Sequence, residues 1–169
     1  GMYYFRELLS ISFKDDRVPQ YIAELLGDMA VTFCHTESLA NALPHLVELL
    51  NHKSANVRSS AAYALGRLSA CTEDIGIQEL LALHSDVSEH TREQAFEALG
   101  RKALASARNC VEIRNQNGIS VLVKLLSDPN NKIRSESLFI LGSLVEVDDI
   151  SRDSIANADL ISRMVALTP

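Results

Sequence analysis

Three arginines recur at equivalent places in the sequence and are the first residues that could act together chemically. Arg58, Arg92 and Arg134 each stand eight residues before a glycine. A row of guanidinium groups could bind anions. Each arginine is also expected in the first turn of a helix, where it can hydrogen-bond an aspartate and nearby carbonyl groups. We therefore expect the arginines to bridge neighbouring structural units rather than to bind a ligand.

The other residue types that support catalysis or metal binding show no functional spacing. Five histidines and three cysteines contain no CxxC, HxxxH or HExxH pattern. No GxSxG, SxxK or phosphate-binding glycine motif is present. Acidic pairs such as Asp15-Asp16 and Asp148-Asp149 are expected at helix ends or in loops. The sequence therefore predicts no enzyme activity, no metal site and no cofactor.

Composition limits the fold class and the partners. The 169 residues include 47% hydrophobic and 22% charged residues, only four prolines and no tryptophan. This composition, without β-type alternation, is typical of an all-helical protein. The net charge of −6 argues against a nucleic-acid or membrane partner, and no apolar run approaches the roughly 20 residues of a membrane span. Three cysteines favour reduced thiols, and hence a cytoplasmic or alternatively nuclear location.

An internal repeat is the strongest signal in the sequence. Each of the three arginines is followed by a Leu-Gly pair, which ends at Gly66, Gly100 and Gly142. A fourth, degenerate copy ends at Gly27 and has Pro19 where the arginine would be. Since a single amphipathic helix pair cannot bury its apolar side, such copies are expected to stack side by side. The recurring glycine predicts a close approach between helices.

Each copy is expected to form two antiparallel helices. The alternation of apolar stripes and polar turns places the first helices near residues 4–13, 42–51, 76–84, 117–127 and 158–167. The second helices are expected near residues 17–33, 56–70, 89–106 and 131–147. On the second helix of the second copy, the predicted core stripe is Val57, Ala61, Ala64, Leu65 and Leu68.

These motifs resemble HEAT and armadillo repeats. The Val-Arg start, the Ala-Leu-Gly ending and an aspartate six residues before the arginine are similar to HEAT units, as in the pairs Asp86–Arg92 and Asp128–Arg134. His52 departs from this pattern. The stretch 113–129 is more similar to an armadillo unit, and this resemblance implies a short extra helix near 107–116. The resemblance implies an all-α, right-handed α-solenoid of about four repeats and a partial fifth, in one domain over residues 2–169, with units near 2–35, 40–71, 75–106, 107–147 and 150–169.

The same resemblance implies where a partner would bind. In these families the second helices line a concave groove that holds a protein or peptide. The positions of the second helices that point away from the predicted core would then form a ladder of partner-binding residues: Glu24, Asp28, Tyr63, Arg67, Glu97, Arg101, Phe139 and Ser143. Exposed aromatic and arginine residues are frequent hot spots in such interfaces.

The expected function is therefore a non-enzymatic scaffold for protein–protein interaction. Two alternatives stay open: an armadillo-type Hsp70 nucleotide-exchange cochaperone, and a HEAT-like accessory to an enzyme, similar to phycobilin lyases. The last predicted helix has no polar helix after it, so Ile161, Met164 and Val165 could pair with a second copy of the chain and form a homo-oligomer.

Overall fold

The computed structural model describes residues 17–33, 37–72, 74–147 and 149–157. All regular structure within these residues is helical. The helices are α2 (Arg17–Phe33), α3 (Glu37–Leu49), α4 (Ala55–Arg67), α5 (Ile77–Ala82) with the 3-10 turn η2 (Leu83–Ser85), α6 (Glu89–Ala105), α7 (Ala107–Asn115), α8 (Gly118–Leu125), α9 (Asn131–Val147) and α10 (Asp149–Asn157).

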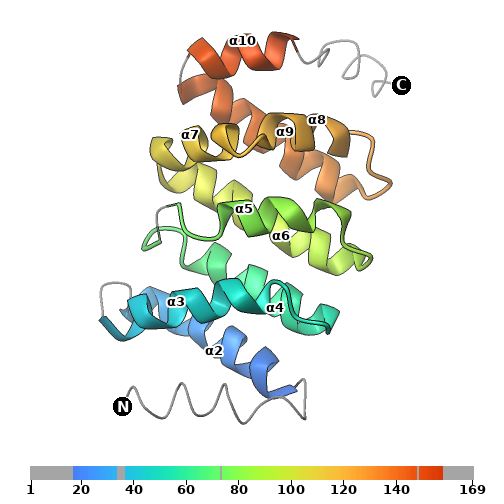
Figure 1. Ribbon diagram of the computed structural model, residues 1–169. Coiled ribbons are helices and arrows are strands. Elements are labelled where there is room, and N and C mark those ends of the chain that lie inside the picture. The colour runs from blue at the N-terminus through green and yellow to red at the C-terminus, as the bar shows by residue number, and fades with distance from the viewer. Residues whose placement is uncertain (1–16, 34–36, 73, 148, 158–169) are drawn as a thin grey trace.

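The helices form two layers. The second helices α2, α4, α6 and α9 pack against one another in sequence order, and α3, α5 and α8 each cover the second helix of their own unit. Figure 1 shows this stack, with α7 lying beside α8 as the extra helix of the fourth unit. The structure is thus the α-solenoid that the repeat predicts.

The core lies between the two layers and follows the predicted stripe. Val57, Ala61, Ala64, Leu65 and Leu68 are all fully buried. The largest side chain of the core, Phe96, is also fully buried, on α6. Removing such apolar surface from water is the main stabilising contribution to a repeat stack, because no single unit can enclose its own core.

Small residues set the distance between adjacent second helices. A Cβ atom added to Gly27 would lie 3.0 Å from the Cα of Ala64, and one added to Gly66 would lie 2.9 Å from the Cα of Ala98. The predicted close approach is confirmed at both seams. At Gly142 no atom of the described residues lies within 4 Å of the added atom, so the predicted close approach is not found in this part of the chain.

The third seam, between α6 and α9, is built differently. The Ala-Leu-Gly ending of the second and third units becomes Ile140-Leu141-Gly142 in the fourth, and Ile140 is fully buried. Around Gly100 the nearest atoms are side-chain atoms, Glu136 Oε2 at 2.9 Å and a Phe139 ring carbon at 3.5 Å, rather than backbone. At this glycine α6 is therefore met by side chains of α9 and not by its backbone.

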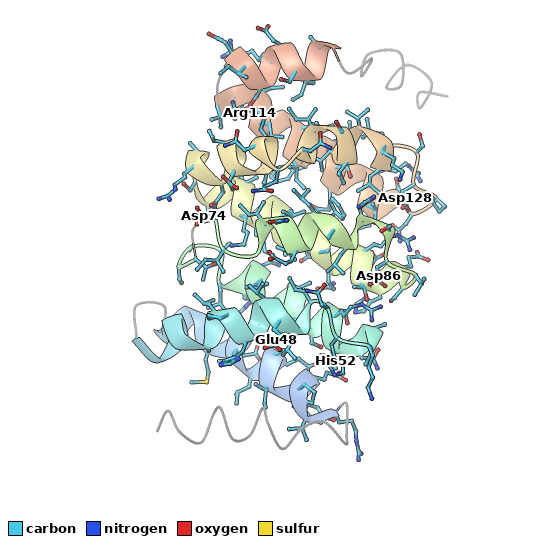
Figure 2. All side chains as sticks on the ribbon, in the orientation of Figure 1. Glu48, His52, Asp74, Asp86, Arg114 and Asp128 are labelled. Atoms are coloured by element: carbon cyan, nitrogen blue, oxygen red, sulfur yellow. The ribbon has the colours of Figure 1, made fainter. Side chains whose placement is uncertain are left out.

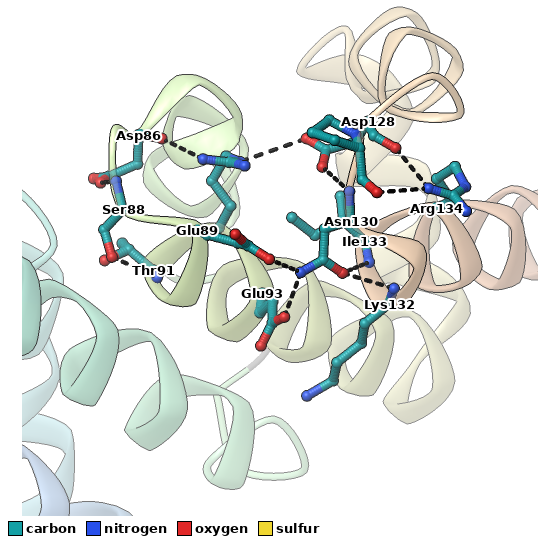
Figure 3. A network of polar contacts seen from close by, with 12 residues as sticks. Asp86, Ser88, Glu89, Thr91, Glu93, Asp128, Asn130, Lys132, Ile133 and Arg134 are labelled. Carbon is teal, nitrogen blue, oxygen red and sulfur yellow. Dashed lines mark hydrogen bonds and ion pairs between the residues drawn. The ribbon is translucent and has the colours of Figure 1, made fainter.

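The arginines connect neighbouring units, although not in the pairing that the spacing suggests. Arg58 is hydrogen-bonded to Asp86 of the next unit through Nε (2.6 Å to Oδ2) and Nη2 (2.8 Å to Oδ1). Arg92 contacts Asp128 of the next unit at 3.5 Å. Each arginine also donates to the carbonyl oxygen six residues before it, as Arg92 does to Asp86 at 2.9 Å (Figure 3).

This pairing explains why His52 is tolerated. Figure 2 shows His52, Asp86 and Asp128 following one another along one edge of the molecule. An aspartate at position 52 would pair with an arginine at position 19, where the chain has Pro19. Both partners of that contact are therefore absent together, and Arg58 keeps its own partner. At the other end, Arg134 donates to the Asp128 and Pro129 carbonyls and contacts no acidic side chain among the described residues.

The environment of Asp86 indicates a structural ion pair. Burial raises the pKa of this carboxyl group, but the Arg58 hydrogen bond, the Ser88 backbone N–H and the charges of Arg58 and Arg92 together lower its pKa below the usual value. The side chains of Arg58 and Asp86 are only 13% and 6% exposed. The arginines thus bridge repeats, as expected, and Arg58 is not accessible to an external anion.

Several expectations lie outside the described residues or need correction. The predicted helices 4–13 and 158–167, with Ile161, Met164 and Val165, lie outside them. Helix α10 was not expected, although its first residue, Asp149, is an acidic residue at a helix end, as predicted. Cys71 is disulfide-bonded, whereas Cys110 is a buried thiol that forms no disulfide and donates to the Ala103 carbonyl. The argument from reduced cysteines therefore fails at Cys71, and the location of the protein stays a prediction.

No helix in the described part of the chain is long and apolar enough to cross a membrane.

The seam glycines give a first testable prediction. Gly66→Ala should destabilise the fold by about 1–3 kcal/mol, because the new Cβ meets the backbone of Ala98. Gly142→Ala is the matched control and should stabilise it by about 0.5–1 kcal/mol, since the site is open and alanine favours a helix. Urea unfolding of both variants measures this; equal effects of the two changes would contradict the seam model.

The inter-unit ion pairs give a second prediction. Asp86→Asn removes the charge that holds Arg58 with two short bonds, and should lower the free energy of unfolding by about 1.5–3 kcal/mol. Asp128→Asn removes a single longer contact and should cost less than about 1 kcal/mol. Both aspartates accept a backbone N–H from the residue two positions later, which asparagine also does, so the pair is matched. A larger loss at Asp128 in thermal or urea unfolding would refute this ranking.

Candidate functional site

The predicted partner-binding residues lie along the second helices. Their outward surface, carried by α2, α4, α6 and α9, is called the ladder face here. At its first seam the side chains are engaged with each other: Glu24 accepts hydrogen bonds from Gln20 and from Ser60 Oγ, both at 2.9 Å. Asp28 is exposed. This part of the ladder face offers few free polar groups.

In the middle of the ladder face, Tyr63 and Arg67 form a cation–π pair. The guanidinium carbon of Arg67 lies 6.0 Å from the centre of the Tyr63 ring. Both side chains are half-buried. The Nε of Arg67 is buried and has no hydrogen-bond partner. Two of the predicted residues, Tyr63 and Arg67, are thus in contact with each other on the ladder face.

A groove opens at the third seam and brings three predicted residues together. It lies between α6 and α9 and has a volume of about 430 Å³. Its lining comprises Glu97, Gly100, Arg101, Leu104, Lys132, Glu136 and Phe139. The apolar side chains remain accessible, with Phe139 43% and Leu104 69% exposed. The groove lies at the seam where Ile140 replaces alanine.

The charges of the groove are arranged around Glu97. This carboxylate accepts a hydrogen bond from Lys132 Nζ at 2.9 Å and from Arg101 Nη2 at 2.8 Å. These two bonds, Lys132 first, lower the pKa of Glu97. Glu136 has the opposite environment, because burial and the nearby charge of Glu97 raise its pKa despite Lys132 and Arg101. Glu97 thus accepts hydrogen bonds from two cations, while Glu136 has no hydrogen-bond partner among the described residues.

Ser143 completes the predicted set without joining the groove. Its hydroxyl donates to the Phe139 carbonyl at 3.1 Å, within its own helix. Sequence reasoning missed Leu104, Lys132 and Glu136. Glu136 could have been found, since it lies one helical turn before Phe139 and shares its side of α9. Lys132 and Leu104 become neighbours of the site only through the packing of α6 against α9.

A buried lysine lies apart from the ladder face and was also missed. Lys102 of α6 is fully buried, and its Nζ donates to the Thr72 carbonyl at 2.7 Å and to Thr72 Oγ1 at 3.0 Å. Burial lowers its pKa to about 8, although Asp74 acts in the other direction. The lysine ties the segment after α4 to α6. Within the described residues, no group of three His, Cys, Asp or Glu side chains could hold a metal ion.

Lys102 predicts a pH dependence of stability. Its folded pKa, about 8, is below the unfolded value of about 10.4, so the unfolded chain binds more protons between these limits. The free energy of unfolding of the native protein, minus that of Lys102→Met, should therefore increase as pH rises from 8 to 10. The increase should be at most about 1.4 kcal/mol per pH unit. Urea unfolding at several pH values measures it, and a constant difference would contradict the assignment.

Comparison with known proteins agrees with this architecture. The chain resembles a designed armadillo repeat protein in complex with the peptide (KR)4, at 20% identity and a TM-score of 0.83, covering 96% of this chain and 72% of that one. An engineered protein matches at 22% identity and a TM-score of 0.83, covering 95% and 69%. Computationally designed armadillo repeat proteins for modular peptide recognition match at 19% identity and a TM-score of 0.78, covering 91% and 69%.

At this level of identity the solved structures show the fold alone. Curated protein sequences give no match. The family model for HEAT repeats, however, matches residues 6–100, which is more than half of the 169 residues. With the stacked helix pairs and the repeated Arg and Leu-Gly positions, this match shows that the chain belongs to the HEAT repeat family.

Proposed function

We propose that this protein is a non-enzymatic interaction scaffold that holds a segment of a partner protein against the ladder face. The groove between α6 and α9 is the observation that carries the proposal. It combines accessible apolar surface on Phe139 and Leu104 with charged groups at its edges. This is the usual composition of an interface centre, in which an apolar anchor is surrounded by polar contacts.

The size of the groove suits a short part of a polypeptide. Its volume of about 430 Å³ is at the lower end of the range of about 300–1,000 Å³ for ligand pockets. One or two side chains of an extended segment fill such a volume, while the rest of the segment follows the ladder face. The neighbouring Tyr63–Arg67 pair on α4 extends the surface in the direction of stacking.

The solved neighbours support a peptide-type partner. One is a designed armadillo repeat protein in complex with a peptide, and another belongs to a series designed for modular peptide recognition. Those proteins share the stacked helices at about 20% identity. The acidic net charge of −6 also favours a protein partner over nucleic acid. No observation on the described residues favours the Hsp70 exchange-factor or lyase-accessory alternatives.

The proposal predicts that binding depends on Phe139. Twelve-residue peptides selected from a random library against the native protein should bind Phe139→Ala at least tenfold more weakly, because the apolar anchor of the groove is lost. Val87→Ala is the control: Val87 is 93% exposed in a turn outside the groove, and its loss should leave affinity unchanged. Fluorescence anisotropy measures both. Selection of no peptide, or equal affinity for both variants, would refute the proposal.

A further inference from the structure

Two opposite charges on the ladder face lack a partner. On α4, the Arg67 guanidinium rests against Tyr63, contacts no acidic side chain among the described residues, and has a buried Nε without a hydrogen bond. Two second helices further along the stack, Glu136 on α9 has no hydrogen bond or ion pair within the same part of the chain. Both groups are half-buried, which makes an unpaired charge costly.

The side chains between them are already satisfied. Glu97 of α6 accepts bonds from Arg101 and Lys132, the two cations nearest to Glu136. These cations are therefore directed to Glu97 and leave the Glu136 carboxylate open toward the groove, above Gly100. Its raised pKa, caused by burial and then by Glu97, is consistent with a carboxylate whose charge Lys132 and Arg101 offset only in part.

We propose that the ladder face recognises an extended protein segment with charges of opposite sign, an acidic residue at Arg67 and a basic residue at Glu136. The inference rests on the proposed scaffold function and specifies the partner. An acidic side chain would pair with the Arg67 guanidinium, which is half-buried and contacts no acidic side chain among the described residues. A basic side chain would pair with Glu136 and lie beside the Phe139 ring, where a cation gains a further attraction.

The repeat geometry fixes the distance between the two charges. Adjacent packed helices lie about 8–10 Å apart, so two seams separate α4 from α9 by about 16–20 Å. Arg67 stands nine residues after Arg58 and Glu136 two residues after Arg134, so the two charges also differ by about 10 Å along the helix axes. The resulting separation is about 19–23 Å, and an extended chain advances by about 3.3 Å per residue. The acidic and basic residues should therefore be separated by about six or seven positions, with apolar residues between them for the groove.

Uniformly charged segments fit this surface poorly. A basic segment would place a positive charge against Arg67, and an acidic segment would place a negative charge against the half-buried Glu136. Like charges in contact disfavour the complex, and they do so more strongly where water is excluded. The distribution of unpaired charges thus distinguishes this chain from a solenoid for basic peptides.

The test uses synthetic twelve-residue peptides with a common apolar centre and two charged positions six residues apart. The four peptides carry Glu/Arg, Arg/Glu, Arg/Arg or Glu/Glu at the first and second charged positions. The affinity of the protein for each peptide is measured by fluorescence anisotropy at low salt. We expect the tighter of the two bipolar peptides to bind at least tenfold more tightly than either uniform peptide. Both bipolar orders are included because the segment can run in either direction along the stack.

Charge reversal on the protein should redirect the preference. Arg67→Glu should favour the Arg/Arg peptide, and Glu136→Lys should favour the Glu/Glu peptide. Lys124→Glu on α8, in the other layer, changes an exposed cation and is the matched control that should alter nothing. Far-UV circular dichroism and melting confirm the fold of each variant. If Arg67→Glu does not fold, Arg67→Gln should abolish the discrimination against the Arg/Arg peptide.

The results separate this inference from the function on which it depends. Equal binding of bipolar and uniform peptides, or binding of none of the four while library-selected peptides still bind through Phe139, would overturn the charge pattern and leave the scaffold intact. An unchanged preference in both charge-reversed variants would also overturn it. Failure of the library selection itself would refute the scaffold function.

Discussion

The close contact between second helices is the constraint on which the rest of the structure depends. Gly27 against Ala64 and Gly66 against Ala98 allow the backbones of α2, α4 and α6 to meet almost directly. Ile140 occupies the equivalent place in α9, fully buried, and the groove lies at that seam. The second helices thus meet backbone to backbone at the first two seams, whereas at the third seam the side chains of Glu136 and Phe139 lie over Gly100 and line the groove.

The polar contacts between units differ from seam to seam. The arginine–aspartate contact between the second and third units is a two-bond ion pair, whereas the next one is a single contact at 3.5 Å. The seam with the longer ion pair carries other polar bonds instead, because Lys132 donates to Glu97 and Asn130 donates to Glu89 and Glu93. On the ladder face, Glu24 accepts bonds from Gln20 and Ser60, while Glu136 accepts none within the described residues.

Much of the fold can be predicted from the sequence, because the same pair of helices with the same apolar stripe recurs in each unit. The stripe of Val57, Ala61 and Leu65 follows from helical periodicity, whereas the extra helix before Gly118 follows from the resemblance of that stretch to an armadillo repeat. Three of the eight predicted site residues, Glu97, Arg101 and Phe139, meet in the groove. The partners of the arginines and the other residues of the groove depend on contacts between neighbouring units, which the spacing within one unit does not encode. For this reason Arg58 pairs with Asp86, and the roles of Lys132, Glu136 and Lys102 became visible only in three dimensions.

Because Arg58 and Arg92 each pair with an aspartate of the following unit, an array of such units can be lengthened by whole units. A unit that contains one arginine and one aspartate in register supplies a donor to the unit after it and an acceptor to the unit before it. Tandem duplication of such a unit therefore regenerates a matched junction without any further substitution. Loss of one member, by contrast, is neutral only when its counterpart in the adjoining unit is lost too, which is the situation of Pro19 and His52.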